Sequence, residues 1–332
     1  MRQRHSIVIS LVMLLTAAFS ASCQKPLHEE TEQYILVAAN INLEYWQEAG
    51  AGFRDSARGL GVKADFQGPT YRSPQEELKV FKEAVAHHPT GILVAPAQPE
   101  LFNTAINEAI SAGIPVITMD TDAPDSKRLL YIGTDNRQAG MESGRQIASL
   151  MNGKGQLVVV TITGQLNMEE RLRGAQEVLA KYPGIKITHT LDDQGDPRTA
   201  NDLLSDLLTK KETVDGIMCL DSSGGPGAGE TLHRLDLGGK IPIVAMDLNV
   251  ETLDFIQQKV ISVTIGQKPY TMAFYGLRFL DDLHHNVVHE FKDWQTAPAS
   301  PLPARVDTGT NVINASNLAA FRAAMASHRS PL

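Results

Sequence analysis

The stretch from Ala109 to Asp120 reads AISAGIPVITMD and decides the class of fold. Its second half, Pro115–Met119, is an almost wholly apolar run, and this run ends at a carboxylate, Asp120. A short apolar run is typical of a strand that lies inside a parallel sheet covered on both faces. The stretch therefore predicts a buried strand of an α/β protein with a polar residue at its carboxyl end.

The same kind of run recurs from Tyr34 onward, and stretches of helical character separate the runs. The predicted strands are Tyr34–Ala39, Val62–Gln67, Gly91–Ala95, Pro115–Met119, Gln156–Ile162, Ile185–Leu191, Asp215–Leu220, Ile241–Met246 and Ile261–Ile265, with a weaker late strand in Arg305–Ile313. This alternation is the pattern of βα units around a parallel sheet. A single sheet could hold nine strands, but the break in rhythm near Gly133–Asn136 favours two similar, doubly wound, Rossmann-like lobes.

The composition excludes two broad classes of protein. The chain has 332 residues, of which 42% are hydrophobic and 20% charged, and this globular composition excludes intrinsic disorder. The formal net charge is -8 at pH 7. Because binding to phosphate backbones needs a basic surface, this charge argues against nucleic acid as a partner.

The first 22 residues have the features of a secretory signal peptide. Arg2 and Arg4 precede the uncharged residues 7–19, and small residues then lead to Cys23. The uncharged run is too short to span ~30 Å of hydrocarbon as a helix, so a permanent transmembrane anchor is the weaker interpretation. The chain is therefore expected to be exported to the periplasm or the cell surface.

Small residues that end in a cysteine resemble the lipobox of bacterial lipoproteins. The resemblance implies that Cys23 is lipidated and that residues 23–33 form a tether to the membrane. Ser20 stands where the lipobox usually has leucine, so an ordinary cleaved signal remains the alternative. Cys219 lies in an apolar run, where we expect it to act as a small buried hydrophobe.

Polar and aromatic side chains follow the predicted strands at their carboxyl ends, where open α/β sheets bind ligands. Carboxylates, amides and a guanidinium supply the donors and acceptors that sugar hydroxyls require, and aromatic rings supply a surface for a sugar face. The sequence therefore predicts a carbohydrate site. Its candidate residues are Asn42, Tyr45, Trp46, Asp120, Asp122, Asn167, Arg171, Asp221, Asp247 and Gln267.

Several motifs in this order resemble the periplasmic sugar-binding proteins of ABC transporters, in the ribose- and galactose-type group with the type I periplasmic binding protein fold. The resemblance covers nearly all of the chain from Tyr34 to about Leu318. Its carriers are Ala109–Asp120, Tyr131–Asn136 with Ala139-Gly140, Asn167 with Arg171-Leu172-Arg173-Gly174 (N-x-x-x-R-x-x-G), and Gln267-Lys268-Pro269-Tyr270.

This resemblance implies two lobes joined by a hinge that the chain crosses three times, near Asp135, Gln267 and Glu290. The N-terminal lobe would hold residues 34–135 and 268–289, and the C-terminal lobe residues 136–267 and 290–323. A ligand would close the lobes, and an ABC permease would recognise the closed form of a monomeric protein.

The resemblance also implies roles for the candidate residues. Tyr45 and Trp46 would stack on the sugar, and Asp120 and Arg171 would hold hydroxyls from opposite lobes. Asp247 and Gln267 would complete the cleft. Ribose binders carry arginine where Thr121 stands, with Asp122 nearby as a replacement, so the particular sugar stays open.

Two other functions use the same features. The module could present a bound sugar to a chemoreceptor or a sensor kinase. Paired carboxylates such as Asp120 and Asp122 could instead serve an exported carbohydrate-active enzyme, although neither a catalytic motif nor a cofactor is predicted.

Two motifs suggest other ligands only superficially. The glycine-rich run Gly224–Glu230 has glutamate where a phosphate-binding loop needs lysine. His285 and His289 are four residues apart beside Glu290, but without a second cluster they predict a solvated helix end and no metal.

Overall fold

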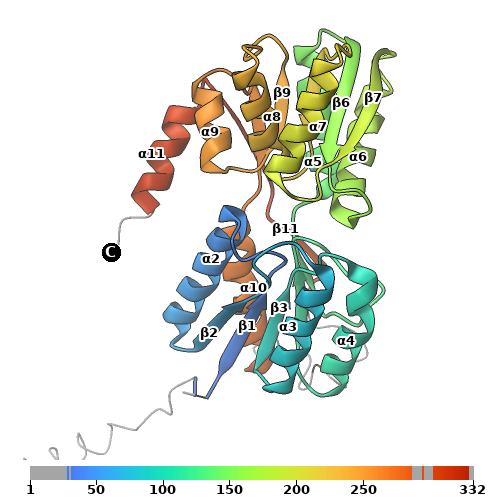
Figure 1. Cartoon of the computed structure of the whole chain (residues 1–332). Coiled ribbons are helices and arrows are strands. Elements are labelled where there is room, and N and C mark those ends of the chain that lie inside the picture. Colours follow the sequence, from blue (N-terminus) through green and yellow to red (C-terminus); the bar gives the residue numbers. More distant parts are fainter. Residues whose placement is uncertain (1–27, 30, 286–293, 295–301, 329–332) are drawn as a thin grey trace, which may run out of the picture.

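The computed structural model describes residues 28, 29, 31–285, 294 and 302–328, and it divides the chain into two lobes stacked end to end (Figure 1). The predicted signal peptide and Cys23 lie outside the described residues. Each lobe is built on a six-stranded sheet with helices on both faces. The predicted class, two doubly wound α/β lobes, is confirmed.

The first lobe contains a sheet in the order β11-β5-β4-β3-β1-β2, with its strands paired in parallel. Its elements are β1 (Gln33–Val37), α2 (Glu44–Leu60), β2 (Lys63–Gln67), α3 (Pro74–Ala86), β3 (Gly91–Val94), α4 (Pro99–Ser111), β4 (Val116–Met119), β5 (Tyr131–Gly133), α10 (Pro269–His284) and β11 (Arg305–Asp307).

Alternating residues of β1 show how the faces of this sheet are covered. Tyr34 and Leu36 pack in one cluster with α2 and α10, whereas Ile35 and Val37 pack in the other with α3 and α4. Successive side chains of a strand point to opposite faces, so a strand covered on both sides must be apolar throughout. This is why the predicted strands are continuous apolar runs.

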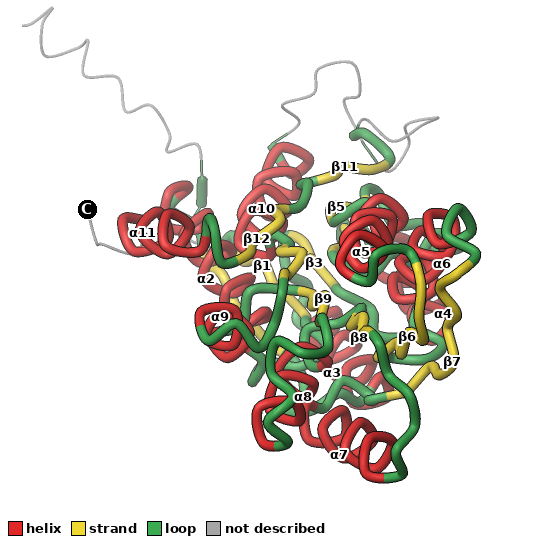
Figure 2. The backbone as a smooth tube through the Cα atoms, turned by 90° about the horizontal axis from the view of Figure 1, so that it is seen from above, coloured by secondary structure: helices red, strands yellow, loops and turns green. Residues whose placement is uncertain are grey.

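The second lobe repeats this plan, with its sheet in the order β12-β10-β9-β8-β6-β7. Its elements are α5 (Asn136–Leu150), β6 (Lys154–Thr161), α6 (Leu166–Leu179), β7 (Gly184–Asp192), α7 (Pro197–Thr209), β8 (Gly216–Cys219), α8 (Gly224–Arg234), β9 (Ile243–Met246), α9 (Val250–Gln257), β10 (Val263–Gly266), β12 (Asn311–Asn314) and α11 (Leu318–His328). Seen from above, α5 and α6 lie side by side, and α8 lies between α7 and α9 (Figure 2).

Two glycines let α5 and α6 approach each other closely. A Cβ atom on Gly140 of α5 would lie 1.9 Å from the carbonyl oxygen of Arg171, and one on Gly174 of α6 would lie 2.0 Å from that of Arg137. Any larger residue at either position must push the helices apart. The glycine in the N-x-x-x-R-x-x-G motif is thus a packing requirement that sets the position of Arg171.

The chain leaves the first sheet after β5 and enters α5 through Thr134 and Asp135, and it returns through Gln267 and Lys268 into α10. A third crossing near Glu290 would place all of residues 290–323 in the C-terminal lobe, and this part of the prediction is wrong. Glu290 lies outside the described residues, but Arg305–Asp307 pairs with β5 in the first sheet. The final passage to the second sheet therefore falls between β11 and β12.

The single strand expected in Arg305–Ile313 is two strands in the structure, because a turn at Gly309 separates them. Gly309 has a φ of 71°, in the left-handed region, and its N–H donates to Asp307 Oδ1 at 2.9 Å. The split yields β11, parallel to β5, and β12, antiparallel to β10. The sequence prediction also omitted β5, because three residues are too few for a periodic signal.

The glycine-rich run at the start of α8 serves helix packing. Cβ atoms on Gly227 and Gly229 would lie 2.5 Å from Ala200 Cβ and 2.3 Å from the Phe255 ring, respectively. Cys219 is fully buried in β8, and burial raises the pKa of its thiol well above the usual value. A buried neutral thiol fits the structural role expected for Cys219.

Candidate functional site: a polar cleft between the lobes

A cavity lies between the lobes, at the carboxyl ends of strands from both sheets. It encloses about 510 Å³, counting the solvent at its mouth. Its lining residues are Ala39, Asn40, Leu43, Tyr45, Trp46, Arg72 and Asp120 from the first lobe, Ile162, Gln165, Met168, Arg171, Gly195, Asp221, Ser222, Ser223 and Asp247 from the second, and Gln267 at the second crossing.

The first lobe contributes an aromatic wall. Tyr45 and Trp46 lie in the first turn of α2, with ring centroids 5.0 Å apart and planes at 82°, an edge-to-face pair. Both rings are buried. The Tyr45 hydroxyl donates a hydrogen bond to Asp120 Oδ2 at 2.6 Å, which ties the wall to the carboxylate at the end of β4.

Asp120 and Asp247 occupy equivalent places in the two sheets. Each follows the third strand of its sheet order, β4 or β9, and each has a left-handed backbone, with φ of 63° and 68°. The Tyr131 hydroxyl donates to the Asp120 carbonyl at 2.8 Å, and Thr264 Oγ1 donates to the Asp247 carbonyl at 2.7 Å. Unfavourable backbone at a non-glycine residue persists only where its surroundings hold it, and it is common at binding sites.

Burial sets the electrostatics of these carboxyls. It raises the pKa of Asp247 to about 7 and raises the pKa of Asp120 above its usual value, while the positive charge of Arg171 opposes both shifts. The pKa of Asp221 is also raised by burial. Arg171 is thus the cation that three buried carboxyls of the cleft share.

Arg171 is fully buried, and its guanidinium is only partly satisfied by the protein. Nε donates to Asn136 Oδ1 at 2.8 Å, and Nη1 donates to the Leu220 carbonyl at 2.6 Å. Nη2 has no hydrogen-bond partner within the described part of the chain. A buried charged donor without a partner is costly, so this nitrogen is suited to a ligand oxygen.

Three further cleft residues contain buried atoms that lack a partner among the described residues: Asp221 Oδ1, Ser223 Oγ and Gln267 Oε1. In Asp221 and Gln267 the other polar side-chain atom already takes part in a hydrogen bond. Asp221 Oδ2 accepts the Ser223 N–H at 2.9 Å, and Gln267 Nε2 donates to Asp247 Oδ1 at 2.9 Å. With Arg171 Nη2, the cleft therefore offers both unpaired donors and unpaired acceptors.

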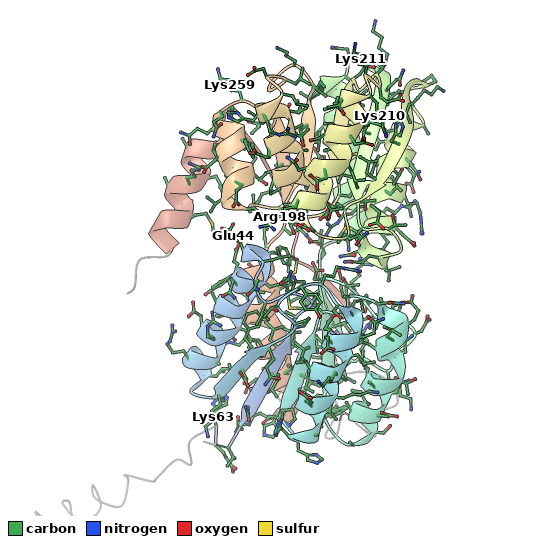
Figure 3. The ribbon with its side chains drawn as sticks, viewed as in Figure 1. Glu44, Lys63, Arg198, Lys210, Lys211 and Lys259 are labelled. Carbon is green, nitrogen blue, oxygen red and sulfur yellow. The ribbon has the colours of Figure 1, made fainter. Side chains whose placement is uncertain are left out.

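Three polar contacts join the lobes. Asn167 Nδ2 donates to Asp120 Oδ1 at 3.2 Å, and Arg72 Nη2 donates to Gln165 Oε1 at 3.0 Å. Glu44, which Figure 3 shows at the end of the first lobe facing the second, accepts the Val250 N–H at the start of α9 at 2.9 Å. The structure is accordingly a conformation in which the lobes are in contact.

Seven of the ten residues proposed from the sequence line the cavity: Tyr45, Trp46, Asp120, Arg171, Asp221, Asp247 and Gln267. The other three do not. Asn42 is exposed and donates to the Thr70 carbonyl at 2.9 Å. Both Asp122 oxygens accept from Arg128 at 2.7 Å, so this carboxylate is already paired. Asn167 is hydrogen-bonded to two lining residues instead: its Nδ2 donates to Asp120 Oδ1, and its Oδ1 accepts from Gln165 Nε2.

Sequence reasoning omitted six polar or flexible residues of the lining: Asn40, Arg72, Gln165, Met168, Ser222 and Ser223. Asn40 directly follows a predicted strand, and Gln165, Ser222 and Ser223 come within three residues of one, so the rule that located Asp120 could have found these four. Arg72 is different, because it comes from the loop between β2 and α3. Only the fold brings that loop to the cleft.

Comparison with known proteins places this geometry in a family. Residues 34–285 match the family described as periplasmic binding protein domain. The chain belongs to the periplasmic binding protein family. Membership confirms the prediction of an extracytoplasmic solute-binding protein rather than an enzyme, and it accounts for two lobes with a cleft between them.

A sequence relative and a solved structure each match most of this chain and most of their own length. The D-allose-binding periplasmic protein of Escherichia coli is 23% identical over 281 residues, which cover 82% of this chain and 87% of that protein. The solved structure of a sugar-binding protein of a sugar ABC transporter from Bacillus halodurans is 31% identical, with a TM-score of 0.77 over 87% of this chain and 99% of that one.

A second solved structure is GanP, a glucose-galactose binding protein from Geobacillus stearothermophilus. It is 27% identical, with a TM-score of 0.79 over 87% of this chain and 99% of its own. Among the residues that the structure describes, no helix combines the length and the apolar character needed to cross a membrane.

Proposed function

We propose that this protein captures one monosaccharide in the interlobe cleft and delivers it to an ABC permease. The observation that carries the proposal is a set of three buried polar atoms, in Arg171, Ser223 and Gln267, that have no hydrogen-bond partner among the residues the structure describes. A sugar hydroxyl both donates and accepts, so a ring bearing several hydroxyls can satisfy unpaired donors and acceptors together. Each bond so formed removes the cost of an orphaned buried group.

The aromatic wall supports the same class of ligand. A pyranose ring has polar edges and a less polar face, and the rings of Tyr45 and Trp46 supply an apolar surface beside the carboxylate of Asp120. In this proposal Asp120 and Arg171 hold hydroxyls from opposite lobes. Asp247, Asp221 and the neutral amide of Gln267 complete the site.

The size of the ligand is inferred from the relatives and the cavity. The names of the relatives in Escherichia coli and Geobacillus stearothermophilus refer to allose, glucose and galactose, which are single sugar rings. Hydrogen bonds from Glu44, Arg72 and Asn167 already connect the two lobes beside the cavity. A monosaccharide therefore fits this conformation better than an oligosaccharide.

Export and anchoring are part of the proposal. Residues 1–22 would be removed, and Cys23 would carry the lipid that holds the protein at the membrane. Mass spectrometry of the protein purified from membranes tests this. A mature N-terminus at Cys23 with added acyl mass supports it, and an unmodified N-terminus elsewhere contradicts it.

The first test of sugar binding is a thermal-shift screen against pentoses, hexoses, deoxysugars, polyols and disaccharides, followed by calorimetry. A sugar at a hundred times its dissociation constant should add about 2.7 kcal/mol to the free energy of unfolding. We expect a shift of several degrees from one or a few monosaccharides, with the sugar recovered intact. Conversion of the sugar, or shifts from disaccharides alone, would contradict the proposal.

A further inference from the structure

Two histidines and two carboxylates meet at the end of the first lobe that lies away from the cleft. They are His28 and Glu32, just before β1, and Asp281 and His285, at the end of α10. The Glu32 carbonyl accepts the N–H of Lys63, which Figure 3 shows at this far end. One potential ligand atom from each of the four side chains lies within 4.8 Å of all the others.

Three distances within this cluster lie between 3.0 and 3.6 Å, and the two shortest are hydrogen bonds between a histidine and a carboxylate. His28 Nε2 is 3.0 Å from Asp281 Oδ1, and His285 Nε2 is 3.1 Å from Glu32 Oε2 and 3.6 Å from Asp281 Oδ1. Ligand atoms 2.0–2.1 Å from a tetrahedral zinc ion lie about 3.3–3.4 Å from one another. These three distances are therefore near the spacing of zinc ligands, and all four ligand atoms lie within 4.8 Å of one another, so zinc would draw them closer together.

Burial and charge favour a cation here. The exposed fractions of the side chains are 4% for Glu32, 8% for Asp281, 12% for His28 and 15% for His285. The two buried carboxylates carry the charge that would balance one divalent ion. The site also follows the C-terminus of α10, whose unpaired carbonyl groups attract positive charge.

Hydrogen bonds around the carboxylates hold them in place. The Tyr34 hydroxyl donates to Asp281 Oδ1 at 3.2 Å, and the Glu29 N–H donates to Glu32 Oε1 at 2.7 Å. A carboxylate held in this way is oriented for a metal ion.

We propose that His28, Glu32, Asp281 and His285 form a zinc site that fastens the segment before β1 to the end of α10. Imidazole nitrogen and carboxylate oxygen are preferred ligands of zinc, and four protein ligands would make the site structural rather than catalytic. The segment 28–32 lies within the predicted tether, residues 23–33. Zinc would thus fix the point at which that tether leaves the lobe, on the side away from the sugar.

The test is calorimetric titration of zinc chloride into the purified protein after removal of metals with a chelator. We expect one zinc ion per chain and a rise in melting temperature of roughly 5 °C when zinc is a hundred times its dissociation constant. Cobalt(II) in place of zinc should give the intense visible absorption of a four-coordinate ion. No binding of zinc, or only the weak absorption of six-coordinate cobalt, would overturn the proposal.

Variants with matched controls locate the site. Changes of second-shell groups commonly weaken metal binding by 10- to 100-fold, so His285→Ala and Asp281→Asn should weaken it by roughly 100-fold or more. His189→Ala, a half-buried histidine of the other lobe, and Asp202→Asn, an exposed residue of α7, should leave it unchanged. Equal zinc affinity in wild type and Asp281→Asn would overturn the assignment, with circular dichroism verifying that each variant is folded. Because the site is remote from the cleft, its failure would leave the proposed sugar binding intact.

Discussion

The helix pair α2–α10 of the first lobe and the pair α6–α5 of the second are built alike but line the cleft differently. Gly52 of α2 and Gly174 of α6 each stand eight residues after the first residue of their helix. A Cβ atom on Gly52 would lie 2.2 Å from the carbonyl oxygen of Tyr270, as one on Gly174 would lie 2.0 Å from that of Arg137. The helix packing is therefore conserved between the lobes.

The side chains at matching positions of these helices are not conserved. Tyr45 and Ala49 of α2 correspond to Asn167 and Arg171 of α6 by their distance from the helix start. The first lobe thus presents a ring and a small apolar residue where the second presents an amide and a buried guanidinium. The two helix pairs have the same backbone arrangement, but the residues at these matching positions make the face of α2 apolar and the face of α6 polar and charged.

The largest effect should come from removing the charge of the second lobe. In Arg171→Met, three carboxyls lose the cation that they share, and we expect a loss of about 3–5 kcal/mol in the free energy of unfolding. Sugar affinity should fall by roughly 10- to 100-fold or more, because a charged hydrogen bond is lost. Chemical denaturation and calorimetry measure the two effects.

Two further variants separate charge from folding in this test. Arg171→Lys keeps the charge but loses the forked geometry, so it should fold and still bind sugar more weakly. Arg173→Ala, on the exposed side of the same helix, should change neither quantity. Wild-type affinity in Arg171→Met would remove Arg171 from the site.

A smaller loss of stability and sugar affinity should follow from disturbing the packing of α5 against α6 in the second lobe. In Gly140→Ala, the new Cβ atom must move away from the Arg171 carbonyl, and overpacking of this kind costs about 1–3 kcal/mol. The displaced helix should also weaken sugar binding, which calorimetry measures. In Gly59→Ala of α2, the new atom meets only the end of the Arg278 side chain, so stability should change by less than about 1 kcal/mol. Equal behaviour of the two variants would contradict the packing argument.

The pH dependence of stability should reveal the buried carboxyl of Asp247. Its folded-state pKa of about 7 lies above the unfolded value of 3.8, so the folded protein holds an extra proton between these values. Stability from this proton is complete below pH 3.8 and is lost as the pH rises through 7. Between pH 6 and pH 8 the loss should be about 1.4 kcal/mol.

Melting temperatures of the sugar-free protein across this range test that expectation. Asp247→Asn has no carboxyl to titrate and should show a shallower decline, whereas Asp254→Asn, a half-exposed residue of α9, should behave as wild type. A stability that rises from pH 6 to pH 8 and is unaffected by Asp247→Asn would contradict the assignment.

The smallest effect should come from the aromatic wall. Trp46→Leu keeps an apolar side chain but removes the flat ring, and the loss of stacking should cost about 0.5–1.5 kcal/mol, or roughly 2- to 12-fold in sugar affinity. Tyr71→Leu, whose side chain is 62% exposed, is the matched control and should bind as wild type. An unchanged affinity in Trp46→Leu would mean that the first lobe contributes through Asp120 rather than through its rings.

Much of the fold could be predicted because buried parallel strands must be apolar on both faces. The carboxyl ends of these strands also mark the edge of the sheet at which ligands bind. Asp120 and Asp247 directly follow such apolar runs, so the sequence alone predicts that they lie at the binding edge of a sheet. Asn42 was misassigned because the choice between it and Asn40 depends on the loop geometry, in which Asn40 Oδ1 accepts the Asn42 N–H at 3.0 Å.

The remaining differences arise from contacts between residues that the sequence does not bring together. Asp122 is taken by Arg128, six residues later, only because the turn after β4 folds back. Arg72 reaches the cleft because β2 and α3 hold its loop beside the second lobe, 93 residues before its partner Gln165. Local pattern gives the strand ends, whereas loop conformation and ion pairing decide which polar groups stay available for a ligand.

The most direct measurement is a crystal structure of the protein with the sugar that the screen identifies. We expect the sugar between the lobes, with a hydroxyl oxygen about 2.7–3.2 Å from Arg171 Nη2 and another hydroxyl donating to Gln267 Oε1. The ring should lie against Trp46. A sugar bound elsewhere, or one in the cleft that leaves Arg171 Nη2 and Gln267 Oε1 without partners, would contradict the account.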